Sequence, residues 1–321
     1  MALIIGYRGK IYLILTITLN PSIDRRYTLE EFQKGEVIRA NNVQYTAGGK
    51  GLNVTRVIRS FKEPVMATGF LGGFSGDYIL NQLDNMEIKY NFISIEGETR
   101  SCLAIISEDG TQTEILENGP IISKEEMERF LELYKNLLKD FNIIVASGSL
   151  PKGLFANTYG ELIKIGKDMG KKFILDTSGE ALEYGIEAAP FLVKPNKEEL
   201  ENLMGRTINS KKDIIDGANY ILNKGVNMVV VSLGKDGSMV FYEDKIYKVE
   251  APNIKVVNSV GSGDAMIAGF AISLMRNYDF QYMLKFATAC GTANAMEMET
   301  GKVNLKNLEY LMEKVVIEKV N

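Results

Sequence analysis

A stretch near the C terminus, residues 257–270, combines residue types that suit phosphoryl transfer. Its β-branched run ends in Gly261, Ser262 and Gly263, and a helical pattern rich in Ala, Ile and Phe follows. The glycines permit a tight turn with exposed backbone, and the first N–H groups of a helix have no partner within it. Together with the positive end of the helix dipole, these donors suit a phosphate group.

Asp264 stands at the mouth of this predicted anion site. A carboxylate repels phosphate, so we interpret Asp264 as a base that takes the proton from an attacking hydroxyl. Strand, glycine turn, carboxylate and helix together indicate phosphoryl transfer to an alcohol. Taken alone, the stretch is explained equally well by an ordinary strand-to-helix turn with Asp264 as a cap.

A second glycine turn, within residues 46–58, also leads into a helical pattern. Together the two turns resemble the paired signatures of the PfkB carbohydrate kinase family, which has the ribokinase-like fold. Further signatures of this family follow in the expected order, at residues 20–24, 147–153, 194–199 and 232–237. The resemblance covers nearly the whole chain and implies an ATP-dependent kinase that phosphorylates an alcohol group of a sugar.

The resemblance places the acceptor sugar at the N-terminal signatures. The positions that hold the sugar in this family correspond to Asp24, Gly49 and Asn53. Gly48 and Gly49 let the backbone approach a hydroxylated ligand, and Asp24 and Asn53 offer directional hydrogen bonds to hydroxyls. For Asp24 alone, the structural alternative is a turn carboxylate after Pro21.

Further polar side chains indicate an acceptor that already carries a phosphate. Lys50 and Arg100 match cationic positions in the phosphosugar branch of the family, and an arginine can grip phosphate in two places. Ser149 adds a hydroxyl donor, and Arg39 is expected to approach from the lid of a partner subunit. A lone surface lysine or arginine is normally a solvated charge, but Lys50 stands within a glycine turn.

The remaining signatures imply the ATP end of the site. The resemblance gives as ATP-binding residues Lys194, Asn196, Ser232, Gly234, Gly237 and Asn294. Glu199 matches a position associated with Mg²⁺, a metal that prefers oxygen ligands and keeps several waters, so Glu199 is expected to act through water. A helix cap at Asn196 followed by an acidic first turn fits the same residues equally well.

Within the family, the chain most resembles the branch that phosphorylates ketohexose monophosphates to 1,6-bisphosphates. The favoured acceptor is the C1 hydroxyl of tagatose 6-phosphate, and the alternative is the C6 hydroxyl of fructose 1-phosphate. Residues 46–56 and 300–305 favour the first substrate, whereas residues 70–74 and 178–182 favour the second.

Other functional classes fit the sequence less well. A sugar-phosphate-binding regulator would be free to lose Asp264, and a nucleoside kinase needs no second phosphate clamp from Lys50 and Arg100. A P-loop is excluded because Lys50 is followed by Gly51, and the dinucleotide fingerprint fails at Met266. The chain has no histidine, which excludes a protein-kinase HRD loop, His-dependent triads and His zinc sites.

Strand-like and helix-like segments alternate, which predicts a three-layer α/β/α domain with a mainly parallel sheet. Several strands are continuous apolar runs, as buried parallel strands should be. Strands are predicted at residues 11–19, 65–71, 142–147, 172–176, 190–194 and 228–232. Helices are predicted at residues 51–61, 76–86, 123–139, 157–169, 197–204, 210–224, 262–276, 280–298 and 304–317.

Two segments, residues 22–46 and 90–117, break this alternation with short extended stretches typical of antiparallel strands. By resemblance, they form a small β-sheet lid over the sugar site. The predicted kinase core then consists of residues 11–21, 47–89 and 118–321, with residues 1–10 as an extension. A small sheet leaves apolar faces and strand edges exposed, so we expect a homodimer clasped through the lids.

The composition fits a cytoplasmic enzyme. The 321 residues are 45% apolar, enough for a sizeable core, and the net charge of −4 argues against a nucleic-acid partner. Cys102 and Cys290 lack CxxC spacing and fit reduced core residues. The apolar run at residues 11–19 follows Arg8 and Lys10 but precedes no cleavage pattern, so a strand is favoured over a signal peptide. No membrane segment is expected.

Overall fold

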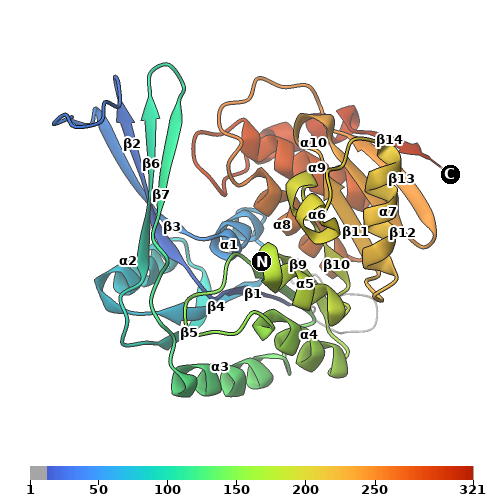
Figure 1. Cartoon of the computed structure of the whole chain (residues 1–321), viewed down its shortest axis with the longest axis horizontal. Helices are drawn as coiled ribbons and strands as arrows, with labels where there is room; N and C mark the ends of the chain where they lie inside the picture. The colour runs from blue at the N-terminus through green and yellow to red at the C-terminus, as the bar shows by residue number, and fades with distance from the viewer. Residues whose placement is uncertain (1–12, 321) are drawn as a thin grey trace.

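A ten-stranded sheet crosses the molecule and carries helices on both faces (Figure 1). The structure is a computed structural model that describes residues 13–320, so the expected extension at residues 1–10 lies outside the described residues. The spatial order of the strands is β14 (Val316–Lys319), β13 (Lys245–Glu250), β12 (Ser238–Tyr242), β11 (Met228–Ser232), β10 (Leu192–Val193), β9 (Lys172–Asp176), β8 (Ile143–Ser147), β1 (Ile14–Thr18), β4 (Val65–Leu71) and β5 (Lys89–Ser94). The strands from β11 to β5 run parallel, and the β12–β14 edge is antiparallel.

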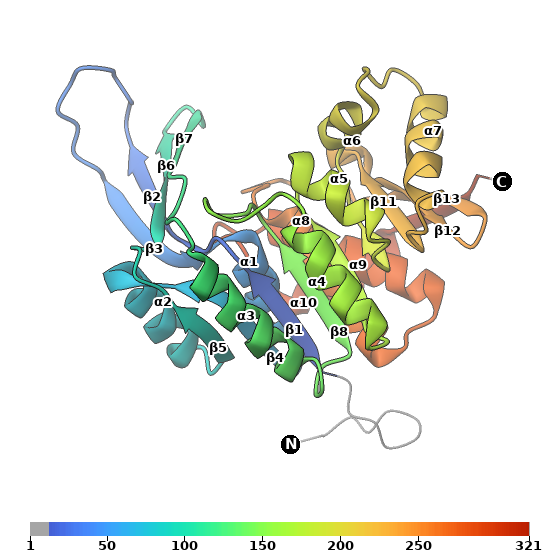
Figure 2. The ribbon, with the colours of Figure 1, turned by 60° about the horizontal axis from the view of Figure 1, so that its bottom comes forward.

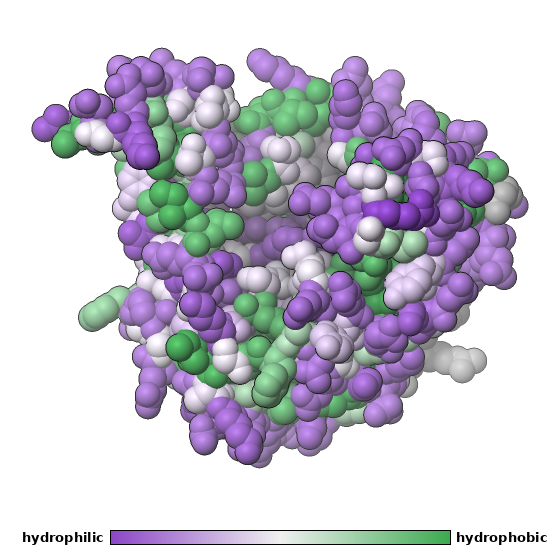
Figure 3. All heavy atoms as spheres, viewed as in Figure 1, coloured by the Kyte–Doolittle hydropathy of each residue, from purple (hydrophilic) through white to green (hydrophobic). Residues whose placement is uncertain are grey.

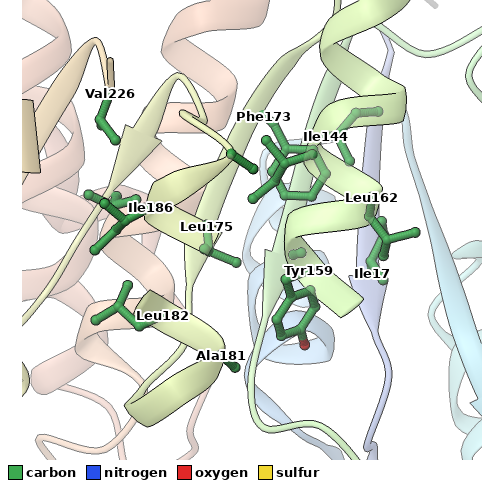
Figure 4. Close-up of a cluster of buried hydrophobic side chains, with 14 of the residues drawn as sticks. Ile17, Ile144, Tyr159, Leu162, Phe173, Leu175, Ala181, Leu182, Ile186 and Val226 are labelled. Carbon is green, nitrogen blue, oxygen red and sulfur yellow. The ribbon is translucent and has the colours of Figure 1, made fainter. Parts of the chain in front are cut away.

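Alternating side chains on the parallel strands form two apolar cores, one on each face of the sheet. Ile14 and Ile174 belong to the first core, and Leu15 and Leu175 belong to the second. The first core is covered by α1 (Lys50–Ser60), α8 (Ser262–Arg276), α9 (Phe280–Ala295) and α10 (Leu305–Lys314). The second is covered by α3 (Lys124–Leu137), α4 (Thr158–Asp168), α5 (Gly179–Glu187), α6 (Lys197–Met204) and α7 (Lys211–Leu222). Figure 4 shows part of this second core, including Tyr159 of α4.

A second, four-stranded sheet stands out from this body (Figures 1 and 2). Its spatial order is β3 (Asn42–Gly48), β2 (Ser22–Leu29), β6 (Arg100–Ser107) and β7 (Gln112–Leu116). The two outer strand pairs are antiparallel, as expected, but β2 and β6 pair in parallel. A third, smaller core joins this sheet to α2 (Gly73–Asn85) and contains Ile23, Leu52 and Ile79.

Residues 90–94 lie outside this small sheet, although the sequence placed them in the lid range. They belong to β5, which pairs in parallel with β4 at the edge of the main sheet. Edge strands are partly solvated, and the side chains of β5 are accordingly exposed or half-buried. Such a strand has the alternating pattern of a free-standing sheet, which explains the error. The division of the chain into a kinase core and a lid stays a prediction.

The predicted strands and helices are all present within the described residues 13–320, with small shifts at their ends. The predicted helix at residues 304–317 ends at Lys314, and residues 316–319 form β14 instead. The sequence did not predict α5 or the β12–β13 hairpin, which are short and have few strong start or stop signals. None of the helices in residues 13–320 has the length and apolar character that crossing a bilayer requires.

Candidate active site

Most of the predicted site residues gather at the carboxyl ends of the central parallel strands. The strand order reverses at β1, which lies between β4 and β8, and ligands of open α/β sheets bind at such points. Asp176 ends β9, and Lys194 directly follows β10. Figure 3 shows this face hollowed between the small sheet and the C-terminal half, with hydrophilic side chains in the hollow.

Asp264 lies in the first turn of α8 and is buried. Asn53 Nδ2 donates a hydrogen bond of 2.8 Å to Asp264 Oδ2. Burial and the nearby Asp176 carboxylate raise the pKa of Asp264 to about 6, against the lowering effects of Lys50, Asn53 and Lys194. A carboxylate whose pKa lies closer to neutral is a stronger base than an ordinary aspartate, which suits general-base catalysis.

The N terminus of α8 is open to an anion. Gly261 adopts a left-handed φ of 81°, and no side chain of residues 13–320 caps the helix. A Cβ at Gly263 would lie 3.1 Å from Lys194 Nζ, so a cation stands beside the turn. The Ser262 hydroxyl is buried and has no hydrogen-bond partner in the described part of the chain. The uncapped turn and its neighbouring lysine suit a phosphoryl group.

Asp176 joins this cluster, although its place in the sequence did not mark it as a candidate. Its buried carboxylate lies 3.2 Å from Lys194 Nζ and 3.8 Å from Lys50 Nζ. Against the effect of burial, Lys194 and Lys50 lower the pKa of Asp176, and Asp176 is the main cause that raises the pKa of Lys50. The available signal was a charged residue closing an apolar strand at the end where ligands bind.

Asp24 lies against the glycine turn that begins α1. Ser22 Oγ donates a 2.6 Å hydrogen bond to Asp24 Oδ1, and a Cβ at Gly48 would lie 2.1 Å from the Asp24 carboxyl carbon. Gly49 has a φ of 98°, a conformation that favours glycine. Burial raises the pKa of Asp24, while Ser22 and nearby cations oppose this effect. The turn therefore brings Gly48, Gly49 and Asp24 together, as a sugar site requires.

Asn53, predicted as a sugar ligand, is already engaged within the protein. Its Nδ2 donates to Asp264, and its Oδ1 accepts a 2.8 Å hydrogen bond from Arg56 Nη2. Each end of an amide can make one further hydrogen bond, so contact with a hydroxyl is still open to it. Arg56 was not predicted as a site residue, because an arginine three residues after Asn53 has the pattern of an ordinary helix surface.

Arg100 and Ser149 both contact Asn20, and the stem of Lys50 lies near Gly148. Arg100 donates to Asn20 O from Nη2 at 3.1 Å and from Nε at 3.3 Å. Asn20 Nδ2 in turn donates to Ser149 Oγ at 3.2 Å. The Cβ of Lys50 lies 3.8 Å from the position of a Cβ on Gly148, next to Ser149. Arg100 and Ser149 are thus brought together through Asn20, whereas the Lys50 ammonium lies 3.8 Å from Asp176.

Arg39 is not brought to this cluster within one protomer. It lies in the exposed segment between β2 and β3, which forms the outer end of the small sheet (Figure 1). Its predicted role at the site of a neighbouring subunit stays a prediction and depends on assembly.

Asn196, Ser232 and Gly234 line a cavity of about 490 Å³ at the predicted nucleotide end. The backbones of Asn196 and Ser232 form a bridge that places them side by side. Gly237 has a φ of 84°, and a Cβ there would lie 2.0 Å from Val249 O, so its turn requires glycine. Lys194, also predicted to bind ATP, lies instead beside Asp176 and the start of α8.

Asn294 has both ends of its side-chain amide engaged within the protein, and its contact with ATP stays a prediction. It is fully buried on α9. Its Nδ2 donates to Val260 O and its Oδ1 accepts from Gly301 N, both at 2.9 Å. These bonds tie the loop before α8 to the loop after α9, so the role of Asn294 in this structure is to hold the two loops together.

Glu199 is the carboxylate predicted to act on a divalent metal through water. Glu199 Oε2 accepts a 2.9 Å hydrogen bond from Asn196 N in a capping box, which leaves Oε1 for a metal-bound water. Within residues 13–320, no cluster of three or more His, Cys, Asp or Glu side chains forms a metal site. Mg²⁺ commonly uses one or two carboxylates, waters and substrate phosphates. The residues therefore fit a metal that binds together with ATP.

Comparison with known proteins identifies the family. The model of the pfkB family of carbohydrate kinases matches residues 17–307. The chain belongs to this PfkB family. The predicted fold and the predicted phosphoryl transfer to a sugar are thereby confirmed, and the kinase depends on ATP.

Individual relatives cover nearly the whole chain. It is 42% identical over 311 residues to tagatose-6-phosphate kinase from Staphylococcus epidermidis, a match that covers 96% of this chain and 100% of the relative. A Thermotoga maritima structure described as a possible 1-phosphofructokinase has a TM-score of 0.89 and 28% identity, covering 97% of this chain and 100% of the other. Phosphofructokinase-2 from Escherichia coli, in complex with potassium, has a TM-score of 0.87 and 27% identity, covering 94% and 98%.

Proposed function

We propose that this kinase transfers the γ-phosphoryl group of ATP to the C1 hydroxyl of tagatose 6-phosphate. The observation that carries the proposal is a second polar site, formed by the Arg100 cation and the Ser149 hydroxyl on either side of Asn20, in addition to the uncapped start of α8. One anion site serves the phosphoryl group in transit, and the other serves a phosphate already on the acceptor. The 42% identity to tagatose-6-phosphate kinase supports tagatose 6-phosphate as that acceptor.

The reaction needs a base, an anion site and a second anchor. The C1 oxygen forms a bond to the γ-phosphorus while the bond from phosphorus to the β–γ bridging oxygen breaks. Asp264 takes the hydroxyl proton, and ADP leaves with the bridging oxygen. The first turn of α8 and Lys194 stabilise the charge on the transferred group. The products are ADP and tagatose 1,6-bisphosphate.

Mg²⁺ is the metal that this site suits best. When bound, it would neutralise the β- and γ-phosphates of ATP. Glu199 would hold it through a water, since one Glu199 oxygen caps α6. Lys50 and Lys194 then balance the charge of Asp176 on the protein side.

The second candidate is phosphorylation of the C6 hydroxyl of fructose 1-phosphate. The Thermotoga maritima structure described as a possible 1-phosphofructokinase supports it, because the two chains superpose along their whole length. Both acceptors carry one phosphate and yield ketohexose 1,6-bisphosphates, so the same two anion sites serve either reaction.

Initial rates at saturating Mg-ATP separate these candidates. The acceptors to compare are tagatose 6-phosphate, its C4 epimer fructose 6-phosphate, and fructose 1-phosphate. The proposal predicts the highest kcat/KM for tagatose 6-phosphate. A higher kcat/KM for fructose 1-phosphate would establish the second candidate instead, and absence of ADP release with all three would reject both.

We also infer that two copies assemble through the small sheet. Its exposed apolar residues include Tyr45, Ile115 and Leu116, and the segment between β2 and β3 exposes Val37. Pairing two such sheets covers these side chains. It also gives Arg39 a neighbouring acceptor site to approach.

A further inference from the structure

We propose that Arg56 is a positioning residue for the base: it locks the Asn53 amide in the orientation that donates to Asp264. This inference rests on the proposed function, in which Asp264 is the base. Arg56 itself touches neither the substrate nor the reacting atoms, because Asn53 stands between it and Asp264.

Arg56 is a buried cation, which requires specific partners. It lies on α1 with an exposed fraction of 7%. Its Nη2 donates to Asn53 Oδ1 at 2.8 Å and to Thr300 O, and its Nη1 lies 3.5 Å from Glu299 Oε1. Of these partners, Asn53 is the one on α1. Its neutral amide lies between the Arg56 guanidinium and Asp264.

The guanidinium determines which way the Asn53 amide faces. Arginine has N–H donors and no acceptor, so the amide oxygen must point to Arg56 and the NH₂ group to Asp264. In the opposite orientation the NH₂ group would meet the guanidinium, and the oxygen would meet the carboxylate. Arg56 thus keeps Asn53 as a donor even at moments when Asp264 carries a proton.

This constraint favours the ionised form of Asp264. An amide that is free to turn could accept a hydrogen bond from protonated Asp264, and this would stabilise the acid form and raise the pKa of the base. The locked amide donates instead, and the Asn53 hydrogen bond indeed lowers the pKa of Asp264. The second carboxylate oxygen is left for the acceptor hydroxyl.

Other charged groups also face Asp264, and their effects must be held constant. Asp176 at the end of β9 raises its pKa, while Lys50 of α1 and Lys194 after β10 lower it. Substituting Arg56 leaves all three in place. A change in the titration of Asp264 therefore reports on the Asn53 amide and the buried cation behind it.

Arg56 also contacts the loop that packs against the start of α8. A Cβ at Gly301 would lie 2.8 Å from Arg56 Nη2, and a Cβ at Gly261 would lie 2.5 Å from Thr300 Cγ2. The loop whose Thr300 carbonyl accepts a hydrogen bond from Arg56 thus packs on Gly261, the residue that precedes α8. A merely structural role would act through this packing, without a specific effect on the base.

The test is the pH profile of kcat for Arg56→Met and Arg56→Lys. In Arg56→Met, the pH at which kcat falls on the acid side of the profile (the acid limb) should rise by about one unit. At pH values below this limb, kcat should be about tenfold lower than in the wild type, and at high pH it should recover. Arg56→Lys keeps a donor, and its limb should lie nearer to that of the wild type. The matched control is Arg59→Met, on the same helix but paired with Glu87 and away from the site.

Asn53→Leu tests the proposed route at the amide itself, with Arg56 left in place. It should shift the limb in the same direction, and the double variant should shift it by less than the sum of the two single shifts. An equal loss of rate at every pH, an unchanged profile, or fully additive shifts would overturn the proposal. If the wild type shows no kinase activity, or Asp264→Asn keeps it, the proposed function fails instead.

Discussion

At the residue scale, the proposed role of Asp264 as the base predicts a defined pH dependence of the kinase. An ionised base is required, and the pKa of Asp264 is raised to about 6. Because protonation removes the base, kcat/KM should fall as pH decreases through about 6 and level off above it. A profile of kcat/KM against pH checks this. A limb near pH 4, typical of an exposed aspartate, would contradict the account.

The phosphate of the acceptor also titrates near pH 6, and a control is needed to separate the two groups. The residual activity of Asp264→Asn supplies it. A limb that belongs to Asp264 disappears in this variant, whereas a limb that belongs to the substrate phosphate persists.

Arg100 is the residue that should determine preference for a phosphorylated acceptor. Hydrogen bonds to charged groups contribute roughly 1.5–3 kcal/mol, so Arg100→Ala should raise the KM for tagatose 6-phosphate about 10- to 100-fold. The KM for ATP should change little. Arg129→Ala, an exposed arginine of α3, is the matched control. Equal activity of the wild type on free tagatose would contradict the second phosphate clamp.

The site residues that the sequence revealed are those with a local signal. Asp264 and Lys50 stand in glycine turns that lead into helices, and that pattern has a chemical meaning on its own. Asp176 and Arg56 have no such local pattern. Asp176 contacts Lys194 and Lys50, which lie 18 and 126 positions away, and Arg56 contacts Thr300, which lies 244 positions away. These contacts are visible only in the fold. The sequence did not show that Asn294 is buried and hydrogen-bonded, because a buried amide and a ligand-binding amide have the same sequence pattern.

At the element scale, the first turn of α8 should act as the anion site. A valine at position 263 would place its Cβ 3.1 Å from the present position of Lys194 Nζ and crowd the open turn. Gly263→Val should therefore lower kcat about 10²- to 10³-fold while the protein stays folded. Steady-state rates and circular dichroism together check this.

Lys124→Val is the control for this prediction, because it places the same residue in the first turn of α3, away from the site. It should leave kcat unchanged. Unchanged kcat in Gly263→Val as well would show that α8 does not receive the transferred phosphoryl group.

Strands whose two faces are both covered by helices were the most predictable elements. β8 and β11 are apolar along almost their whole length, because helices cover them on both sides. β5 was misplaced because an edge strand and a lid strand share the same alternating pattern. The parallel pairing of β2 with β6 could not be predicted, since register and direction depend on segments more than 70 residues apart.

At the scale of the whole molecule, we expect a dimer clasped through the small sheets. Val37 is 92% exposed in the segment between β2 and β3, next to Ile38. Charged substitutions, Val37→Glu and Ile38→Glu, should dissociate the dimer and reduce activity. Light scattering at micromolar concentration measures the mass. Met169→Glu, an exposed position at the end of α4, is the control.

Two results would contradict this assembly. A wild-type protein that is monomeric and fully active at micromolar concentration would remove the need for a clasp. A dimer that persists in the Val37→Glu and Ile38→Glu variants would place the interface on another surface.

The most direct test of the account is the product formed from tagatose 6-phosphate and Mg-ATP by the wild type and by Asp264→Asn. The wild type should convert the two substrates stoichiometrically to tagatose 1,6-bisphosphate and ADP. Asp264→Asn should bind ATP normally, yet form product about 10²- to 10⁴-fold more slowly, the usual contribution of a positioned base. Near-wild-type turnover in Asp264→Asn, or ADP release without a bisphosphate product, would contradict the account.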